Sequence, residues 1–258
     1  AYHYKGFNNK YTPSNNNKIL AYSFEKEQSD DDISSYLKFR DLSNDAMEGV
    51  IPGTSEEIRQ IASIFDGDYY YANMASKSSF IENCEEYKIL HLAVHGIADD
   101  KRPDFSRLKF YGQEQNYLHA FEIYNLKLNA ELAILSACES GTGQVKNGEG
   151  VMSLGRAFSI AGAKSMVLSK WEISDITAPV IMKYFYSALA AGKRKSEALR
   201  IAKNQFLEND ADNITSVPYY WASFYVMGDD SPIEFNQPWH QSYRLLSIMI
   251  LLPLITAA

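Results

Sequence analysis

Short apolar runs alternate along this chain with segments in which apolar residues recur every three or four positions. Unbroken apolar runs are typical of strands buried on both faces of a parallel sheet, and the wider spacing is typical of helices with one buried face. The pattern predicts strands at residues 18–24, 69–71, 88–94, 132–135, 165–169 and 222–227. It predicts helices at residues 55–66, 78–86, 120–126, 149–161, 175–191 and 196–208. Strands and helices that alternate in this order indicate a mostly parallel central sheet between two helix layers, an α/β fold.

The starts of two of these helices carry capping signals. Thr54 followed by Glu57 predicts a capping box at the start of the first helix, after the turn at Pro52 and Gly53. Ser174 is the predicted N-cap of the long helix that ends near residue 191. The charged segment 25–48 between the first strand and the first helix is predicted to be a solvated loop.

Two of the predicted strands end at residues that can do chemistry. The run 88–94 ends at His95 and Gly96, and the run 132–135 is followed closely by Cys138 and then by a polar, glycine-rich segment, residues 139–150. In open α/β sheets, ligands bind at the carboxyl ends of the strands. If the two strands are neighbours, their ends place an imidazole beside a thiol.

An imidazole beside a thiol is the arrangement of a cysteine nucleophile and its base. In this hypothesis Cys138 attacks a carbonyl carbon, His95 accepts and returns the proton, and the backbone N–H groups of Gly96 and Cys138 hold the oxyanion. The reaction class is acyl transfer, and peptide hydrolysis in particular. The sequence indicates no third catalytic residue and no cofactor.

Simpler interpretations of the same residues stand beside this hypothesis. A cysteine after an apolar run is often an inert core residue, which is the interpretation given to Cys84, and a histidine after a strand is often a surface group. A zinc site formed by His91, His95 and Cys138 is the other chemical alternative. It is disfavoured, because four residues along a strand separate the two rings by roughly 13 Å, and the sequence offers no fourth ligand.

Composition excludes some classes of protein. The 258 residues carry 32 acidic and 25 basic side chains, a net charge of −7. An excess of acidic residues argues against a nucleic-acid-binding protein, which needs a basic surface to contact phosphates. Two cysteines are too few for a disulfide-stapled secreted fold. The absence of an initiator methionine and of a signal pattern favours a piece excised from a longer protein.

The C-terminal segment 245–258 is almost wholly apolar. Its 14 residues fall short of the ~20 that span a bilayer, but Trp239, Tyr243 and Arg244 precede it in the manner of interface anchors. A truncated membrane anchor is the favoured interpretation and a core helix is the alternative. The compartment stays open between membrane association through this segment and the cytoplasm.

The two strand ends carry motifs of a known family. Residues 90–96 (LHLAVHG) and 135–141 (LSACESG) resemble the His-Gly and Ser-Ala-Cys signatures of the CHAT domain, which belongs with caspases, separase and gingipains. Residues 148–151 (GEGV), 169–171 (SKW) and 221–225 (WASFY) match the same family in the same order. The likeness runs from about residue 18 to about residue 230.

This resemblance implies a caspase-like three-layer α/β/α sandwich and a cysteine endopeptidase with a His95–Cys138 dyad that cleaves a specific protein substrate. Through the likeness of residues 171–175 (WEISD) to a separase segment that lines the pocket for a basic residue, it implies that Asp175 lines the S1 subsite and pairs with an Arg or Lys before the cleaved bond. The alternative is that Asp175 is a first-turn helix residue favoured by the helix dipole. Members are often joined to N-terminal tetratricopeptide repeats, so a repeat region or regulatory partner is expected. Some bacterial members act in defence. A catalytically silent partner-binding module with the same fold is the alternative function.

The predicted domain organisation has three parts. Residues 1–17 are a lead-in or the end of a preceding domain, residues 18–232 are the protease domain, and residues 233–258 are the apolar C-terminal segment.

Overall fold

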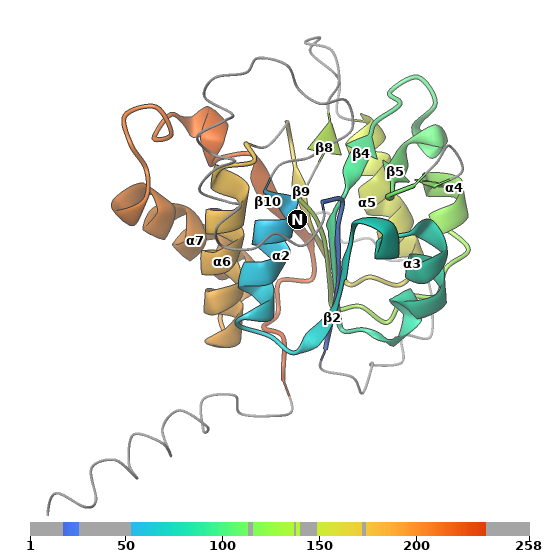
Figure 1. The fold of residues 1–258 in the computed structure, drawn as a ribbon, viewed down its shortest axis with the longest axis horizontal. Coiled ribbons are helices and arrows are strands. Elements are labelled where there is room, and N and C mark those ends of the chain that lie inside the picture. The colour runs from blue at the N-terminus through green and yellow to red at the C-terminus, as the bar shows by residue number, and fades with distance from the viewer. Residues whose placement is uncertain are drawn as a thin grey trace, which may run out of the picture.

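The computed structural model describes residues 18–25, 53–112, 116–136, 138–139, 149–171 and 174–235, with only the backbone described at 138–139 and 149. Within these ranges the chain forms a central sheet with helices on both faces (Figure 1). The predictions for residues 1–17 and 245–258 fall outside them. None of the helices in the described ranges is long and apolar enough to cross a membrane.

The central sheet has six strands in the order β10-β9-β7-β3-β1-β2. Every neighbouring pair is parallel except β10 with β9, which is antiparallel. The strands are β1 (Ile19–Ser23), β2 (Gly67–Tyr71), β3 (Ile89–Ala93), β7 (Leu132–Leu135), β9 (Ser165–Ser169) and β10 (Phe224–Gly228). The prediction of an α/β sandwich with a mostly parallel sheet is therefore confirmed.

The helices form the two outer layers of the sandwich. Figure 1 shows α2, α6 and α7 on one face of the sheet and α3, α4 and α5 on the other. Their bounds are α2 (Thr54–Ala62), α3 (Lys77–Asn83), α4 (Ala120–Ile123), α5 (Glu149–Ala161), α6 (Thr177–Ala190) and α7 (Lys195–Asn209), with short 3-10 turns η1 (Ala72–Met74), η2 (Cys84–Glu86), η3 (Pro103–Phe105) and η4 (Pro218–Tyr220).

A second, smaller sheet continues from the carboxyl edge of the first. Its four strands have the order β6-β5-β4-β8, namely β4 (His95–Ile97), β5 (Arg107–Lys109), β6 (Tyr117–His119) and β8 (Cys138–Glu139). Strand β4 follows β3 after a break at Val94, and β8 follows β7 closely. Two neighbouring strands of the large sheet thus each lead into a strand of the small one.

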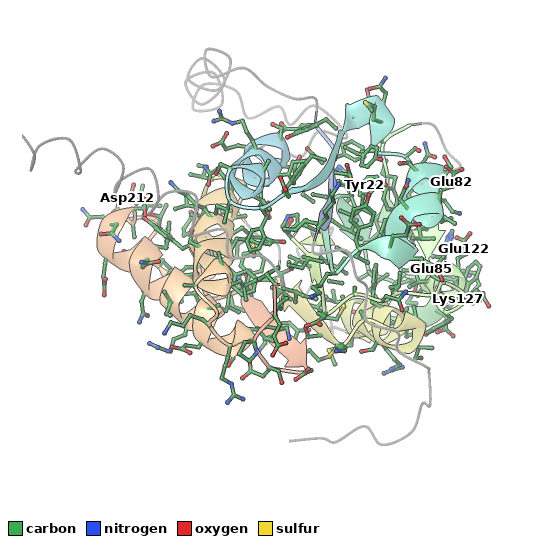
Figure 2. All side chains as sticks on the ribbon, turned by 90° about the horizontal axis from the view of Figure 1, so that it is seen from below. Tyr22, Glu82, Glu85, Glu122, Lys127 and Asp212 are labelled. Carbon is green, nitrogen blue, oxygen red and sulfur yellow. The ribbon has the colours of Figure 1, made fainter. Side chains whose placement is uncertain are left out.

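Alternation along the central strands separates two hydrophobic cores, because successive side chains of a strand point to opposite faces. In β1, Leu20 and Tyr22 face the layer of α3 and α5, whereas Ile19 and Ala21 face the layer of α2 and α6. Figure 2 shows Tyr22 in the interior and Glu82 at the outer surface of α3. Both faces of β1 are buried, which explains why its sequence is an unbroken apolar run.

Both predicted helix caps are wrong. Gly53, with a left-handed φ of 84°, is the N-cap of α2, and Thr54 is the first helical residue. The side chain of Glu57 does not reach back to the cap, because it points inward to His91. The N-cap of α6 is Ile176, and the Ser174 hydroxyl accepts from the Ile176 N–H before the helix begins.

Candidate functional site

The backbone places the two predicted catalytic residues on adjacent strands. β3 and β7 pair in parallel, with Leu92 opposite Leu135. Their continuations β4 and β8 also pair in parallel, with Gly96 opposite Cys138. His95 therefore precedes the residue that lies directly opposite the cysteine. The side chain of Cys138 and the segment 140–148 lie outside the described part of the chain, so the geometry of the predicted dyad stays a prediction.

The His95 ring is held by aromatic packing. The side chain is buried, and its ring meets the Phe24 ring edge-to-face at a centroid distance of 4.7 Å. Phe24 in turn packs on Tyr111, and the Lys109 ammonium lies 5.7 Å from the Phe24 ring centre. Residues beyond the ends of β1 and β5 thus support the imidazole from one side, which fixes the plane of the ring.

His91 lies in β3, four residues before His95, in a buried cluster that we call the His91 cluster: Glu57, His91, Ser136 and Tyr186. Glu57 Oε1 lies 2.9 Å from His91 Nε2, and the Tyr186 hydroxyl lies 2.9 Å from His91 Nδ1. The Ser136 hydroxyl lies 3.5 Å from Nε2. In the tautomer with its proton on Nε2, Nδ1 accepts from the Tyr186 phenol, while Glu57 Oε1 lies close to Nε2 but without hydrogen-bonding geometry.

The zinc alternative includes Cys138, whose side chain lies outside the described part of the chain, so it stays untested. Of its other two residues, His91 has Tyr186 beside Nδ1 and Glu57 beside Nε2. Among the residues whose side chains are described, no group of three His, Cys, Asp or Glu could hold a metal ion. Ser136 belongs to the cluster and stands two residues before Cys138, so the cluster anchors the chain that leads into β8.

Glu25 is a buried acid at the end of β1, where the sequence predicted a solvated loop. Only 5% of its surface is exposed. Its Oε2 accepts from the Ser55 N–H at 3.2 Å and from the Ser55 hydroxyl at 3.1 Å, so it caps the first turn of α2. Burial raises the pKa of the Glu25 carboxyl, and the N–H groups of this turn offset part of that rise. The solvated-loop prediction is wrong at this residue, because the helix start supplies donors that a loop would not.

Asp175 lies at the same corner of the molecule as Glu25. A side chain at Gly53, the N-cap of α2, would collide with the Asp175 carbonyl oxygen, so the backbone at Asp175 packs directly against the start of α2. Asp175 itself is half-buried. The predicted S1 residue and the capped helix start are thus brought together, although one follows β9 and the other precedes α2.

The loop after His95 is tied to the helix that follows the cysteine. The Asp100 carboxylate accepts from the Gly150 N–H at 2.9 Å in the first turn of α5. A Cβ at Gly150 would lie 2.6 Å from the Ala98 Cβ and 2.8 Å from the Asp99 N, so only glycine allows this approach. The two chain segments that leave the paired strands β4 and β8 therefore meet again at the start of α5.

Sequence reasoning missed Glu25, Glu57 and the role of His91. The available signal was alternation: Ser23 and Glu25 continue the face of Ala21, and His91 lies on the same side of its strand as Ile89 and Ala93. Polar residues on a buried face require partners, and an acid in the facing first turn of α2 could supply them.

The comparisons with known proteins identify a family. The CHAT domain model matches residues 2–229 of this chain. Tetratricopeptide repeat protein 28 is 30% identical in Mus musculus and 31% identical in Homo sapiens, each over 121 residues. That match covers 47% of this chain but only 5% of either relative.

Among solved structures, the Arg specific cysteine proteinase gingipain R is similar at 10% identity and a TM-score of 0.46, over 84% of this chain and 47% of that one. The complex of Porphyromonas gingivalis RgpB pro- and mature domains gives 9% identity and the same TM-score, over 84% and 48% of the two chains.

Proposed function

The chain belongs to the CHAT domain family, a member of the caspase-like clan, and on that premise we propose that it is a cysteine endopeptidase with His95 and Cys138 as its catalytic dyad. The observation that supports this most directly is the pairing of Gly96 with Cys138 across β4 and β8. Neighbouring strands lie about 4.8 Å apart, so the backbones of His95 and Cys138, one residue out of register on adjacent strands, lie close together. Within the ranges that the structure describes, no other histidine and cysteine follow adjacent strands in this way.

The proposed reaction proceeds in two steps. His95 accepts the Cys138 proton, the thiolate attacks the scissile carbonyl carbon, and the C–N bond breaks as His95 donates the proton to the leaving amine. Water then attacks the thioester while His95 takes its proton, the C–S bond breaks, and the peptide acid leaves. The packing of His95 on Phe24 supports this role, because a base whose ring plane is fixed loses little rotational freedom on reaction.

Two further residues belong to the proposal. The N–H groups of Gly96 and Cys138 are proposed to stabilise the oxyanion, since donors preorganised at that point lower the barrier. Asp175 is proposed to line the S1 subsite, and its position against the start of α2 supports this because that helix begins at the carboxyl edge of the sheet.

The proposed target is a specific protein. Tetratricopeptide repeat protein 28 carries a similar segment within a much longer chain, and this supports the proposal that a repeat region accompanies the peptidase and selects its substrate. Repeat arrays offer extended concave surfaces that bind peptides and proteins.

A proteome-derived peptide library tests the activity without knowledge of the target. The library is incubated with the wild-type chain, with Cys138→Ala and with His95→Ala, and new peptide ends are read by mass spectrometry. We expect new ends with the wild-type chain alone. New ends that persist with both variants would contradict the proposed dyad. His119→Ala is the matched control, because His119 is half-buried beside Glu122 in β6, two strands from β4 in the small sheet, and is expected to leave cleavage unchanged.

A further inference from the structure

Arg107 and Lys109 are two basic residues of β5 that point to the same side of the small sheet, because successive side chains of a strand alternate. Leu108 between them is buried in the core, whereas both basic side chains are half-buried. The Arg107 guanidinium lies 4.9 Å from the centre of the Tyr117 ring, and the Lys109 ammonium lies 5.7 Å from the centre of the Phe24 ring. The two charges therefore share the outward face of β5.

Neither of these charges has an acidic partner. Among the side chains that the structure describes, no carboxylate lies within 4.0 Å of Arg107 or Lys109. The neighbouring cation His119, opposite Arg107 on β6, does have one, because the Glu122 carboxylate contacts both His119 and Lys77. In a chain of net charge −7, two adjacent cations without counter-ions form a local positive field that attracts anions.

The aromatic rings hold the two cations in place without neutralising them. A ring attracts a cation through its quadrupole and carries no net charge. A guanidinium that lies over a ring still presents the N–H groups of its edge, which bind a carboxylate in a bidentate manner. Arg107 and Lys109 are thus preorganised donors for an acidic group.

Both cations flank the proposed catalytic histidine. Lys109 is opposite His95 in the pairing of β4 with β5, and the Phe24 ring contacts the His95 ring as well as the Lys109 ammonium. Arg107 is opposite Ile97, two residues beyond His95. Figure 1 shows β4, β5 and β8 together at the end of the sheet where β3 and β7 terminate. In the small sheet, β5 lies on one side of β4 and β8, which carries Cys138, lies on the other.

The proposed reaction directs a defined part of the substrate to this side of His95. His95 protonates the leaving amine, which belongs to the residue after the cleaved bond. The substrate segment that follows therefore passes His95 on the side away from Cys138, where β5 lies. An extended chain advances about 3.3 Å per residue, so the second or third residue after the bond comes within reach of Lys109.

We propose that Arg107 and Lys109 form a subsite for an acidic segment of the protein substrate, which places Asp or Glu at the second or third position after the cleaved bond. This inference rests on the proposed function, because it needs His95 and Cys138 as the dyad. Two cations on an acidic protein draw an anionic segment towards the site and disfavour a basic one, so the subsite contributes to the choice of substrate.

The experiment uses the proteome-derived peptide library and reads the residues on both sides of each new end. The wild-type chain is compared with the double variant Arg107→Gln/Lys109→Gln and with the charge reversal Lys109→Glu. Lys127→Gln/Arg200→Gln is the matched control, because it removes the same two charges at exposed positions before β7 and in α7. Figure 2 shows Lys127 at the outer surface of the molecule.

The wild-type chain and the control are expected to show Asp and Glu at these positions at about three times their frequency in the library or more, since each partly exposed ion pair contributes modestly and two act together. Arg107→Gln/Lys109→Gln is expected to lose the enrichment. Lys109→Glu is expected to shift it towards Lys and Arg, which a purely structural role of Lys109 would not produce. The wild-type enrichment is also expected to fall when NaCl is raised from about 0.05 M to about 0.5 M, because salt screens exposed charges. The salt series needs no variant and tests the inference even if a variant does not fold.

Three results would overturn the inference and leave the peptidase proposal intact. The first is cleavage by the wild-type chain without enrichment of Asp and Glu, and the second is an enrichment that Arg107→Gln/Lys109→Gln retains. The third is enrichment of phosphoserine or phosphothreonine in place of Asp and Glu, which would give the two cations a different occupant. If the wild-type chain produces no new ends at all, the proposed function itself is contradicted and the inference falls with it.

Discussion

Removal of the Tyr186 hydroxyl tests the His91 cluster without changing its shape. In Tyr186→Phe, His91 Nδ1 loses the phenol that lies 2.9 Å away, and both side chains are fully buried, so water does not replace the donor. Burial holds the pKa of Tyr186 well above its usual value, so the phenol is a donor throughout the neutral range. An unsatisfied buried acceptor costs about 1–3 kcal/mol of unfolding free energy.

The assay is thermal and urea unfolding of the wild-type chain and of Tyr186→Phe. For a domain of this size each kcal/mol lowers the melting temperature by about 2–4 °C. Tyr184→Phe on the same helix is the control, because the Tyr184 hydroxyl donates to Asp210 at the surface, at 2.7 Å. That change is expected to stay within about 0.5 kcal/mol. If both variants lose the same amount of unfolding free energy, the hydrogen bond in the buried His91 cluster is worth no more than the surface one, and the reasoning is refuted.

Gly53→Ala is expected to destabilise the chain by clearly more than the roughly 1–2 kcal/mol that a left-handed φ costs a residue with a Cβ, because the new methyl group collides with a backbone carbonyl. Gly192→Ala, at φ 74° in open space, is expected to show only the backbone cost, and urea unfolding of both separates the two contributions. Burial raises the pKa of the Cys84 thiol to about 12, so at pH 8 iodoacetamide is expected to modify Cys138 and to leave Cys84 unmodified until the protein is unfolded; mass spectrometry of native and urea-treated protein checks this. Burial raises the pKa of Glu25 in the folded chain, so the folded chain holds the Glu25 proton at pH values where the unfolded chain has released it. The free energy of unfolding is therefore expected to fall as pH rises from about 4.3, the ordinary glutamate pKa, to the raised pKa of the folded chain. Glu25→Gln is expected to flatten that part of the stability profile, and an unchanged profile would contradict the assigned pKa direction.

Most of the fold could be predicted from the sequence because the central strands are buried on both faces. Runs such as residues 132–135 have no polar position, so their type and approximate ends follow from composition alone. The antiparallel direction of β10 could not be predicted in this way, since its apolar run is compatible with either direction. The small sheet was also missed, because strands of two or three residues carry too short a pattern to detect.

Some residues of the candidate site could be predicted from the sequence in the same way, and others could not. His95 and Cys138 follow recognisable strands, so their placement on neighbouring elements could be predicted from the sequence. Glu25 could not, because it follows an apolar strand and precedes a charged segment, and only the fold brings the first turn of α2 to it. The capping box at Thr54 failed for a related reason: the first turn of α2 is buried, Glu25 accepts from its Ser55 N–H, and the Glu57 carboxylate lies beside His91.

The central claim is that His95 activates Cys138, and the rate at which iodoacetamide modifies Cys138 at pH 7 tests it most directly. His95→Gln keeps a polar side chain of similar size, and His119→Gln in the half-buried β6 controls for the loss of any histidine. We predict that Cys138 reacts at least about tenfold faster in the wild-type chain and in His119→Gln than in His95→Gln, because an adjacent imidazole raises the thiolate fraction. Equal rates in all three proteins would contradict the account.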